Sequence, residues 1–202
     1  VSGAAYHTQI NDLLLSALSE SLSQLTSATV HHIVLEGHGR EEIDEAIDVA
    51  RTIGWFTTMY PVRLEQQPEL GATIQWTKEQ LRAVPARGLG YGAVVGYNDS
   101  DLLLPGISFN YLGQFDADSE SDWFITSEES GCAVSEVNED SHLLELNGWV
   151  FDGVLHFDIE SVWDELTTIR FASLFKAALD RVVSHTVNLG RTYLTVSDVD
   201  YI

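Results

Sequence analysis

The stretch at residues 30–41, VHHIVLEGHGRE, decides how the chain is expected to fold. Its first six residues are β-branched or apolar enough to form a strand. Glu36 therefore falls where that strand ends, and the two glycines allow a sharp turn because they reach backbone angles closed to other residues. Glu36, His38 and Arg40 bring a carboxylate, an imidazole and a guanidinium to this strand end. Such a gathering is typical of a functional site on a rigid scaffold, although an ion-paired surface turn has the same composition.

The neighbouring elements are expected from hydrophobic spacing and turn residues. Helices are predicted over Thr8–Leu25, over Glu41–Arg51, from a capping Thr77 to about Val84, and over Glu165–Val187 with Ile169, Ala172, Phe175, Leu179 and Val182 on one face. Strands are predicted over Thr29–Leu35, Phe56–Leu64 and Ile107–Gln114, followed by an antiparallel pair, His142–Asn147 with Val150–Val162. The resulting order αβαβαβββα predicts an α/β fold (α+β layered), a mixed β-sheet with helices packed on it.

Single residues refine this framework. Pro61 cannot donate to a sheet ladder, so the strand over 56–64 is expected at an edge. Gly148 and Asp152-Gly153 are candidate turns, of which Asp-Gly is the stronger hairpin signal. Strict alternation along 107–114 places Phe109, Tyr111 and Gly113 on one face and Asn110, Leu112 and Gln114 on the other.

Composition limits the function classes. The 202 residues are 45% apolar, which suits one globular domain, and no apolar run approaches the ~18 residues of a membrane span. The formal charge of −21 makes nucleic acid and anionic membranes unsuitable partners. One cysteine, Cys132, excludes an internal disulfide framework and suits a reducing cytoplasm. The acidic cluster Asp116–Glu129 lacks the spacing of a calcium loop and is interpreted as solvated, and no metal site is predicted.

Four further segments accompany the glutamate turn in a fixed order. They are QINDLLL at 9–15, RTIGWFTTMYP at 51–61, PARGLGYG at 85–92 and FNYLGQFD at 109–116. PARGLGYG lacks the lysine and hydroxyl residue of a phosphate-binding loop, so it is expected to shape a tunnel mouth or lobe interface. Together the five segments resemble the motif series of the epimerization domains of nonribosomal peptide synthetases, which belong to the condensation-like, chloramphenicol-acetyltransferase-like enzymes. The resemblance runs from about Tyr6 to Ser197-Asp198.

This resemblance implies a two-lobed domain of which residues 1–202 are the C-terminal lobe. The N-terminal lobe, with its motif His-His-x-x-x-Asp-Gly, is then absent from this sequence. His31-His32-Ile33-Val34-Leu35-Glu36-Gly37 reads like that motif with Glu in place of Asp. A second acyltransferase-like site would explain it, but the Gly-His-Gly-Arg-Glu continuation favours ordinary strand histidines.

The chemistry that the resemblance implies is inversion at the α-carbon of an aminoacyl or peptidyl thioester. The substrate is carried on the 4'-phosphopantetheine of a peptidyl carrier domain, and no cofactor is bound directly. Glu36 is the expected proton-transfer group, facing the histidine of the other lobe. Tyr111 is a second candidate that could hold the thioester or assist protonation, although it shares a strand face with Phe109 and an aromatic strand residue is commonly a core residue. Substrate-channel or supporting roles are expected for His38, Arg40, Asn110, Gln114 and Trp55.

Two other functions fit the same class of fold: a condensation-type acyltransferase lobe and a non-catalytic module that docks carrier domains. The motifs at 36–41 and 109–116 favour epimerization. A lobe separated from its partner would expose an apolar face, so self-association is also expected.

Overall fold

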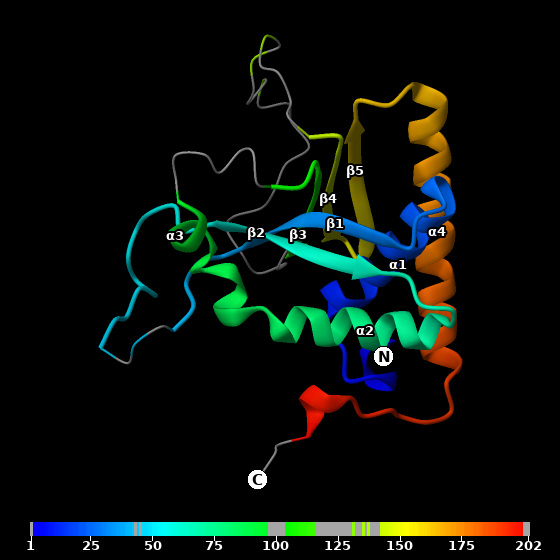
Figure 1. Cartoon of the computed structure of the whole chain (residues 1–202), viewed down its shortest axis with the longest axis horizontal. Helices are drawn as coiled ribbons and strands as arrows, with labels where there is room; N and C mark the ends of the chain where they lie inside the picture. Colours follow the sequence, from blue (N-terminus) through cyan, green and yellow to red (C-terminus); the bar gives the residue numbers. More distant parts are fainter. Residues whose placement is uncertain are drawn as a thin grey trace.

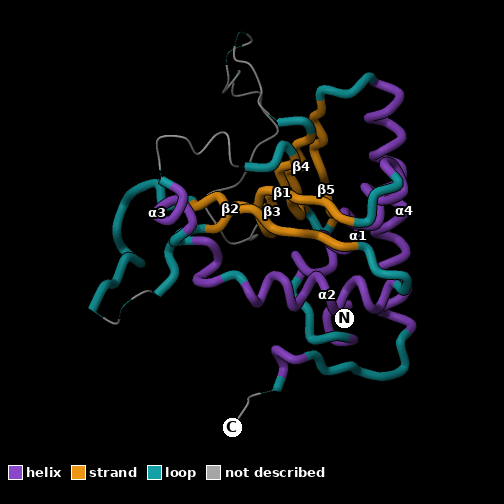
Figure 2. Tube along the Cα trace, in the orientation of Figure 1, coloured by secondary structure: helices purple, strands orange, loops and turns teal. Residues whose placement is uncertain are grey.

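The computed structural model describes residues 2–42, 44, 46–96, 104–115, 131, 135, 137 and 142–199. One layer is a five-stranded mixed sheet in the order β2-β1-β3-β4-β5, and α1, α2 and α4 pack together on it (Figures 1 and 2). The strands are β1 Val30–Gly37, β2 Thr58–Glu65, β3 Ile107–Phe115, β4 Leu144–Phe151 and β5 Val154–Ser161. The helices are η1 Ser2–Ala5, α1 Ile10–Thr26, α2 Leu70–Ala83, η2 Pro85–Gly88, α3 Tyr91–Val95, α4 Glu165–Asn188 and η4 Val196–Asp198. The predicted α/β class is confirmed.

The sheet is held together unevenly. β1 pairs antiparallel with β2 along its full length, and β4 pairs in the same way with β5. The central parallel pairing of β1 with β3 is limited to Val34 with Ser108 and Leu35 with Phe109. Beyond those residues the two strands separate toward their carboxyl ends. A crevice between parting parallel strands is where open α/β sheets bind ligands.

The hydrophobic core lies between the sheet and the helices. Residues 12–19 of α1 are all buried, because α1 packs against both α2 and α4 as well as the sheet. Phe157 of β5 lies between Phe109 of β3 and Phe175 of α4, with ring centroids 6.0 and 5.0 Å away. This aromatic contact ties the far end of the sheet to its longest helix.

Most predicted elements are confirmed within a few residues: the helix over 10–26, the strands over 30–37, 58–65 and 107–115, and the helix from Glu165. Pro61 lies in the edge strand β2, as its missing N–H requires. The hairpin turn is Asp152-Gly153, with φ of 49° and 71°. The second candidate turn, Gly148, is wrong, because Gly148 is an interior residue of β4.

The helix predicted over Glu41–Arg51 is wrong. In the described part of this segment the backbone forms turns instead. The carboxylates of Asp44 and Asp48 accept hydrogen bonds from the amides of Ala46 and Ala50, both at 2.8 Å. Such local side-chain bonds compete with helical hydrogen bonds, which explains the failure of an apolar spacing that suits a helix.

Two further helix details differ from prediction. α2 begins at Leu70, seven residues before the predicted cap Thr77, which is buried inside the helix. In the first turn of α2, the Thr73 hydroxyl accepts a hydrogen bond from the backbone amide of Gln67, which precedes the helix, at 3.0 Å. The buried stripe of α4 is Phe171, Phe175, Ala178, Val182 and Thr186, so the predicted face is right at Phe175 and Val182 and wrong at Ile169, which is 54% exposed.

A bulge in β3 overturns the predicted alternation. Tyr111 pairs with Gly148, but Gln114 pairs with Val150, so β3 has one extra residue in between. Gly113, with φ of 99°, accommodates this extra residue. Gln114 therefore shares the sheet face of Tyr111, not that of Asn110.

The two strand histidines are structural. His31 is buried, and its Nε2 lies 3.1 Å from the Ala28 carbonyl oxygen and 3.3 Å from the Ser23 hydroxyl. Burial lowers the pKa of His31. His32 is exposed on the other sheet face. The interpretation as ordinary strand residues is confirmed. Cys132 and the cluster Asp116–Glu129 lie outside the described residues.

The described helices include none with both the length and the apolarity needed to cross a bilayer. Among the described residues, His, Cys, Asp and Glu side chains also form no group of three suited to a metal ion.

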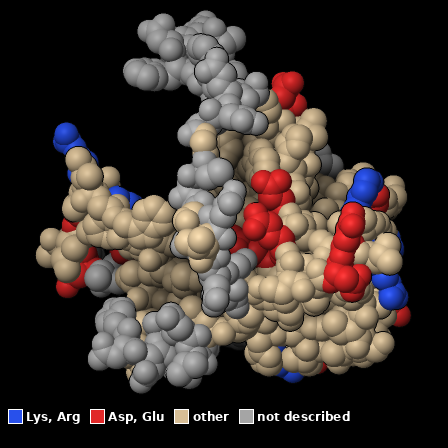
Figure 3. Space-filling model, turned by 90° about the horizontal axis from the view of Figure 1, so that it is seen from above, with Lys and Arg blue, Asp and Glu red and all other residues tan. Residues whose placement is uncertain are grey.

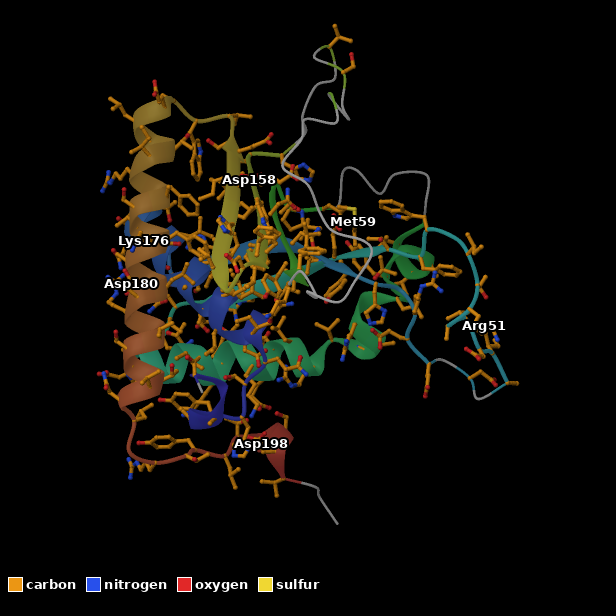
Figure 4. All side chains as sticks on the ribbon, turned by 180° about the vertical axis from the view of Figure 1, so that it is seen from behind. Arg51, Met59, Asp158, Lys176, Asp180 and Asp198 are labelled. Carbon is orange, nitrogen blue, oxygen red and sulfur yellow. The ribbon has the colours of Figure 1, made fainter. Side chains whose placement is uncertain are left out.

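A buried ion pair between Lys78 and Asp198 holds η4 against α2. Lys78, 1% exposed, donates to Asp198 at 2.5 Å and to the Tyr6 carbonyl at 2.9 Å. Asp198 also accepts from the backbone amide of Thr195 at 2.8 Å and lies at the lower end of the molecule in Figure 4. Burial alone would raise the pKa of Asp198, but the hydrogen bonds from Lys78 and Thr195 hold it at about 2.

We predict that Gly148→Ala destabilises the fold. A Cβ at this position would lie 2.3 Å from the ring of Phe157, which is itself wedged between two other phenylalanines. Overpacking of this kind costs about 1–3 kcal/mol. Urea unfolding measures the loss. Gly190→Ala is the matched control, because its Cβ would meet nothing within 4 Å. Equal stabilities for the two variants would contradict the prediction.

We also predict that the Lys78–Asp198 pair makes stability acid-sensitive. Since the folded pKa of Asp198 is depressed to about 2, its contribution is complete above an unfolded pKa of about 4 and is lost as pH falls toward 2. The difference in urea midpoint between the protein and Asp198→Asn should shrink as pH is lowered from 5 to 3. The surface pair Lys176–Asp180 provides the control Asp180→Asn, whose difference should stay small throughout.

Candidate functional site

The candidate site lies where β1 and β3 separate. Glu36 is the penultimate residue of β1, and Asn110 lies one residue beyond the last β1–β3 pair. The Asn110 amide Nδ2 donates to Glu36 Oε2 at 3.2 Å and so bridges the gap with a side-chain bond. Two of the five sequence motifs thus meet in space through a specific contact.

A cavity of about 620 Å³ opens at this point. Its walls come from the ends of β1 and β3, the start of α1, and the end of α2 with the segment after it. Four predicted site residues line it: Glu36, His38, Asn110 and Tyr111. A larger and more apolar cavity, about 830 Å³, lies between β2, α2 and α3. We place the site in the smaller cavity because Glu36 lines that one, and the larger one contains none of the predicted site residues.

The glycine turn after Glu36 is rigidly built. Gly39 has φ of 66°, and a Cβ there would lie 1.5 Å from the Phe56 carbonyl oxygen, so the turn requires glycine. The imidazole of His38 accepts from the Arg40 amide at 3.0 Å through Nδ1 and lies 3.0 Å from the Glu41 carboxylate through Nε2. His38 is therefore held by its own turn, at the cavity wall.

Arg40 organises the loop that was expected to be a helix. Its guanidinium donates to the carbonyls of Val49, Thr52 and Gly54, and it lies 4.3 Å from the centre of the Phe56 ring. These contacts explain how residues 46–56 hold a defined path without regular structure. The guanidinium thus supports the loop beside Glu36.

The base of the cavity holds an ion pair that sequence reasoning missed. Asp12, fully buried in the first turn of α1, accepts two hydrogen bonds from the Arg82 guanidinium of α2, at 3.0 and 2.8 Å. It also accepts from the amide of Gln9 at 2.7 Å, completing a capping box. The spacing of Gln9 and Asp12 in the motif at 9–15 was the available signal. Arg82 could not have been paired with it from sequence.

Desolvation shifts the pKa of Glu36 and of Tyr111 at the cavity. The pKa of Glu36 is raised, chiefly by desolvation and then by the negative charge of Glu145, while His142 opposes the shift. Glu36 remains solvent-exposed, so water still screens these charges. Desolvation raises the pKa of the Tyr111 hydroxyl as well. A carboxylate with a raised pKa is a stronger base than an unperturbed one.

The remaining predicted residues lie apart from the cavity. Trp55 is 91% exposed, in the segment between β1 and β2. Gln114 is exposed beyond the β3 bulge. Their channel roles stay predictions. PARGLGYG forms η2 and the start of α3, and its Ala86 and Arg87 line this cavity, while most of the segment lines the larger one. Its role at a tunnel mouth stays a prediction.

Charge is unevenly distributed around the molecule. Seen from above, one group of Asp and Glu side chains lies near the middle of the face and others lie toward its edges, where the visible Lys and Arg side chains also lie (Figure 3).

Comparisons with known proteins agree on one family. The model of the condensation domain matches residues 3–201. Surfactin synthase subunit 1 of Bacillus subtilis (strain 168) is 38% identical over 96% of this chain, which spans 6% of that synthase. The epimerization domain from the third module of tyrocidine synthetase B is 35% identical, with a TM-score of 0.81 over 92% of this chain and 44% of that one. The first condensation domain of the CDA synthetase is 13% identical, with a TM-score of 0.58 over 95% of this chain and 42% of that one, which shows a shared fold.

We predict that Arg40→Lys loosens the loop 46–56. Lysine keeps the charge but cannot donate in the fork geometry that reaches several carbonyls. Faster amide hydrogen exchange in this loop is expected, with little change in the strands. Arg51→Lys is the control, since Arg51 is an exposed residue of the same loop. Unchanged exchange in Arg40→Lys would show that the loop does not depend on the guanidinium.

Proposed function

Because this chain belongs to the condensation-domain family, we propose that it is the C-terminal lobe of an epimerization domain of a nonribosomal peptide synthetase. The observation that carries the proposal is the hydrogen bond from Asn110 to Glu36 at the mouth of a polar cavity. The higher identity to an epimerization domain than to a condensation domain, 35% against 13%, supports it. A condensation-type acyltransferase lobe is the alternative.

The reaction is inversion of an α-carbon next to a thioester carbonyl. A base removes the α-proton, the carbonyl oxygen takes the negative charge of an enolate, and a proton returns to the opposite face. No net oxidation or reduction occurs. Glu36 is proposed as one of the two proton-transfer groups, and the histidine of an N-terminal lobe as the other.

The neighbours of Glu36 suit this role. Asn110 fixes one carboxylate oxygen without neutralising it, which leaves the other oxygen to face the substrate. Desolvation raises the pKa of Glu36 and so increases its basicity. Tyr111 lines the same cavity, and its hydroxyl stays protonated because burial raises its pKa, so it can donate to the thioester oxygen.

The substrate is proposed to arrive on the 4'-phosphopantetheine of a peptidyl carrier domain. The cavity is open at the strand ends, which lets a long, thin arm enter while the carrier domain stays outside. The N-terminal lobe is proposed to cover the cavity. Apolar side chains are exposed on β2 and β3 near the site, at Met59 (37%) and Leu112 (52%), and they fit such a contact.

The proposal is tested by α-proton exchange. A carrier-bound L-aminoacyl thioester in deuterated water is offered to the two-lobed domain containing this chain, to the same domain with Glu36→Gln, and to this chain alone. Loss of a positioned proton-transfer group costs about 10²–10⁴-fold, so exchange should require both lobes and fall by that factor in the variant.

The matched control is Glu160→Gln, an exposed glutamate on β5. It should exchange at the rate of the unmodified domain. Exchange that survives Glu36→Gln would move the proton transfer to other residues. Peptide-bond formation without exchange would favour the condensation-type lobe.

A further inference from the structure

A row of polar side chains continues from Glu36 across the sheet. Asn110 of β3 is the register partner of Asn147 of β4, and the Asn147 amide Nδ2 donates to Glu145 Oε1 at 2.7 Å. The imidazole Nδ1 of His142 lies 3.7 Å from Glu145 Oε2. The motif series includes none of these three β4-side residues.

Register places this row on one face of the sheet. Residues that pair across neighbouring strands share a face, and alternate residues of a strand do so too. Val34 pairs with Ser108, and Ser108 with Glu145, so Glu36, Asn110, Asn147 and Glu145 all project from the face opposite the helices. Adjacent strands are about 4.8 Å apart, so β1 and β4 are separated by two such spacings with β3 between them, and Glu145 is level with Val34, two residues before Glu36.

We propose that Glu145, held by Asn147 and His142 on the same face of the sheet as Glu36, is a positioning residue that tunes Glu36 through its charge. The inference rests on the proposed function, because it assigns Glu145 to the proton transfer at Glu36. Glu145 itself does not touch the substrate. Its role is to keep Glu36 a stronger base than an isolated carboxylate.

The physical basis is like-charge repulsion between two carboxylates on the same face of the sheet. The carboxylate of Glu145 disfavours a second negative charge at Glu36, which adds to the rise in pKa that desolvation produces. His142 acts in the opposite sense, so the pair sets the strength of the effect. Covering this face with a second lobe would exclude water and strengthen the interaction, because the effective dielectric constant falls.

Other charged side chains line the cavity that Glu36 lines. They lie on the turn, on the segment after α2 and on the helices that line the same cavity: His38, Glu41, Arg87, Asp12 and Arg82. Asp12 is paired with Arg82, and Glu41 lies between His38 and Arg87, at 3.0 and 3.6 Å. Glu145 is a carboxylate of β4 whose charge raises the pKa of Glu36.

The test measures the titration of Glu36 directly. In the two-lobed domain with ¹³C-labelled glutamate, the Glu36 carboxyl signal is assigned by its loss in Glu36→Gln. Glu145→Gln should move the Glu36 midpoint to lower pH, and His142→Asn should move it to higher pH. Glu160→Gln is the matched control, since Glu160 is the β5 register partner of Glu145, one strand farther from Glu36, and it should leave the midpoint unchanged.

Activity supplies an independent readout. In Glu145→Gln the limb of the pH–rate profile that Glu36 governs should shift to lower pH, whichever direction Glu36 moves the proton, and Glu145→Asp should restore much of it. An unmoved Glu36 midpoint in both Glu145→Gln and His142→Asn, with the fold intact by circular dichroism, overturns the inference. A moved midpoint in a domain that exchanges no α-proton overturns the proposed function instead.

Discussion

The candidate site depends on the short parallel pairing of β1 with β3, which involves two residue pairs. Two parallel residue pairs, Val34 with Ser108 and Leu35 with Phe109, join the two halves of the sheet. If the pairing continued, backbone hydrogen bonds would close the space that the cavity occupies, and Glu36 and Asn110 would be ordinary neighbours on a closed sheet. Because the pairing stops, one side-chain bond at 3.2 Å takes the place of the ladder. A side-chain bond can respond to a ligand and to pH in ways that a backbone ladder cannot.

The remainder of the fold keeps this opening from collapsing. α1 lies beneath β1 and directs its first turn, with Asp12, at the cavity, while the end of α2 supplies Arg82 to the same carboxylate. A buried carboxylate is costly unless it is paired and hydrogen-bonded, so the pair fixes the spacing of the two helix ends. On the other side, Arg40 gathers the carbonyls of a loop that has no regular structure. Hydrogen bonds from Arg82 and Arg40 therefore stabilise the walls of the cavity where apolar packing is lacking.

Sequence patterns predicted much of this arrangement and failed for physical reasons where they failed. The strand before Glu36, the Asp152-Gly153 hairpin and the start of α4 carry strong local signals, and each is observed. The helix predicted after Arg40 does not form, because the carboxylates of Asp44 and Asp48 accept hydrogen bonds from backbone amides two residues ahead. Apolar spacing does not take such local hydrogen bonds into account. Gln114 was assigned to the wrong face because a bulge at Gly113 adds one residue to β3. The partners Arg82 and Glu145 come from distant parts of the chain, and one sequence holds no information on such pairings.

Motifs contain residues whose chemical group is required at one position. A residue that shifts the pKa of such a group needs only to carry a charge at a suitable distance. Glu36 and Asn110 must meet at hydrogen-bonding distance, so they occur within compact, recognisable segments. Glu145 exerts its influence across the width of a strand, where a Coulomb interaction changes slowly with position and a carboxylate elsewhere on the face could serve in its place. A tuning residue of this kind leaves no local signature. It becomes visible when strand register shows which side chains share a face with the motif, and β4 is the strand that provides that information here.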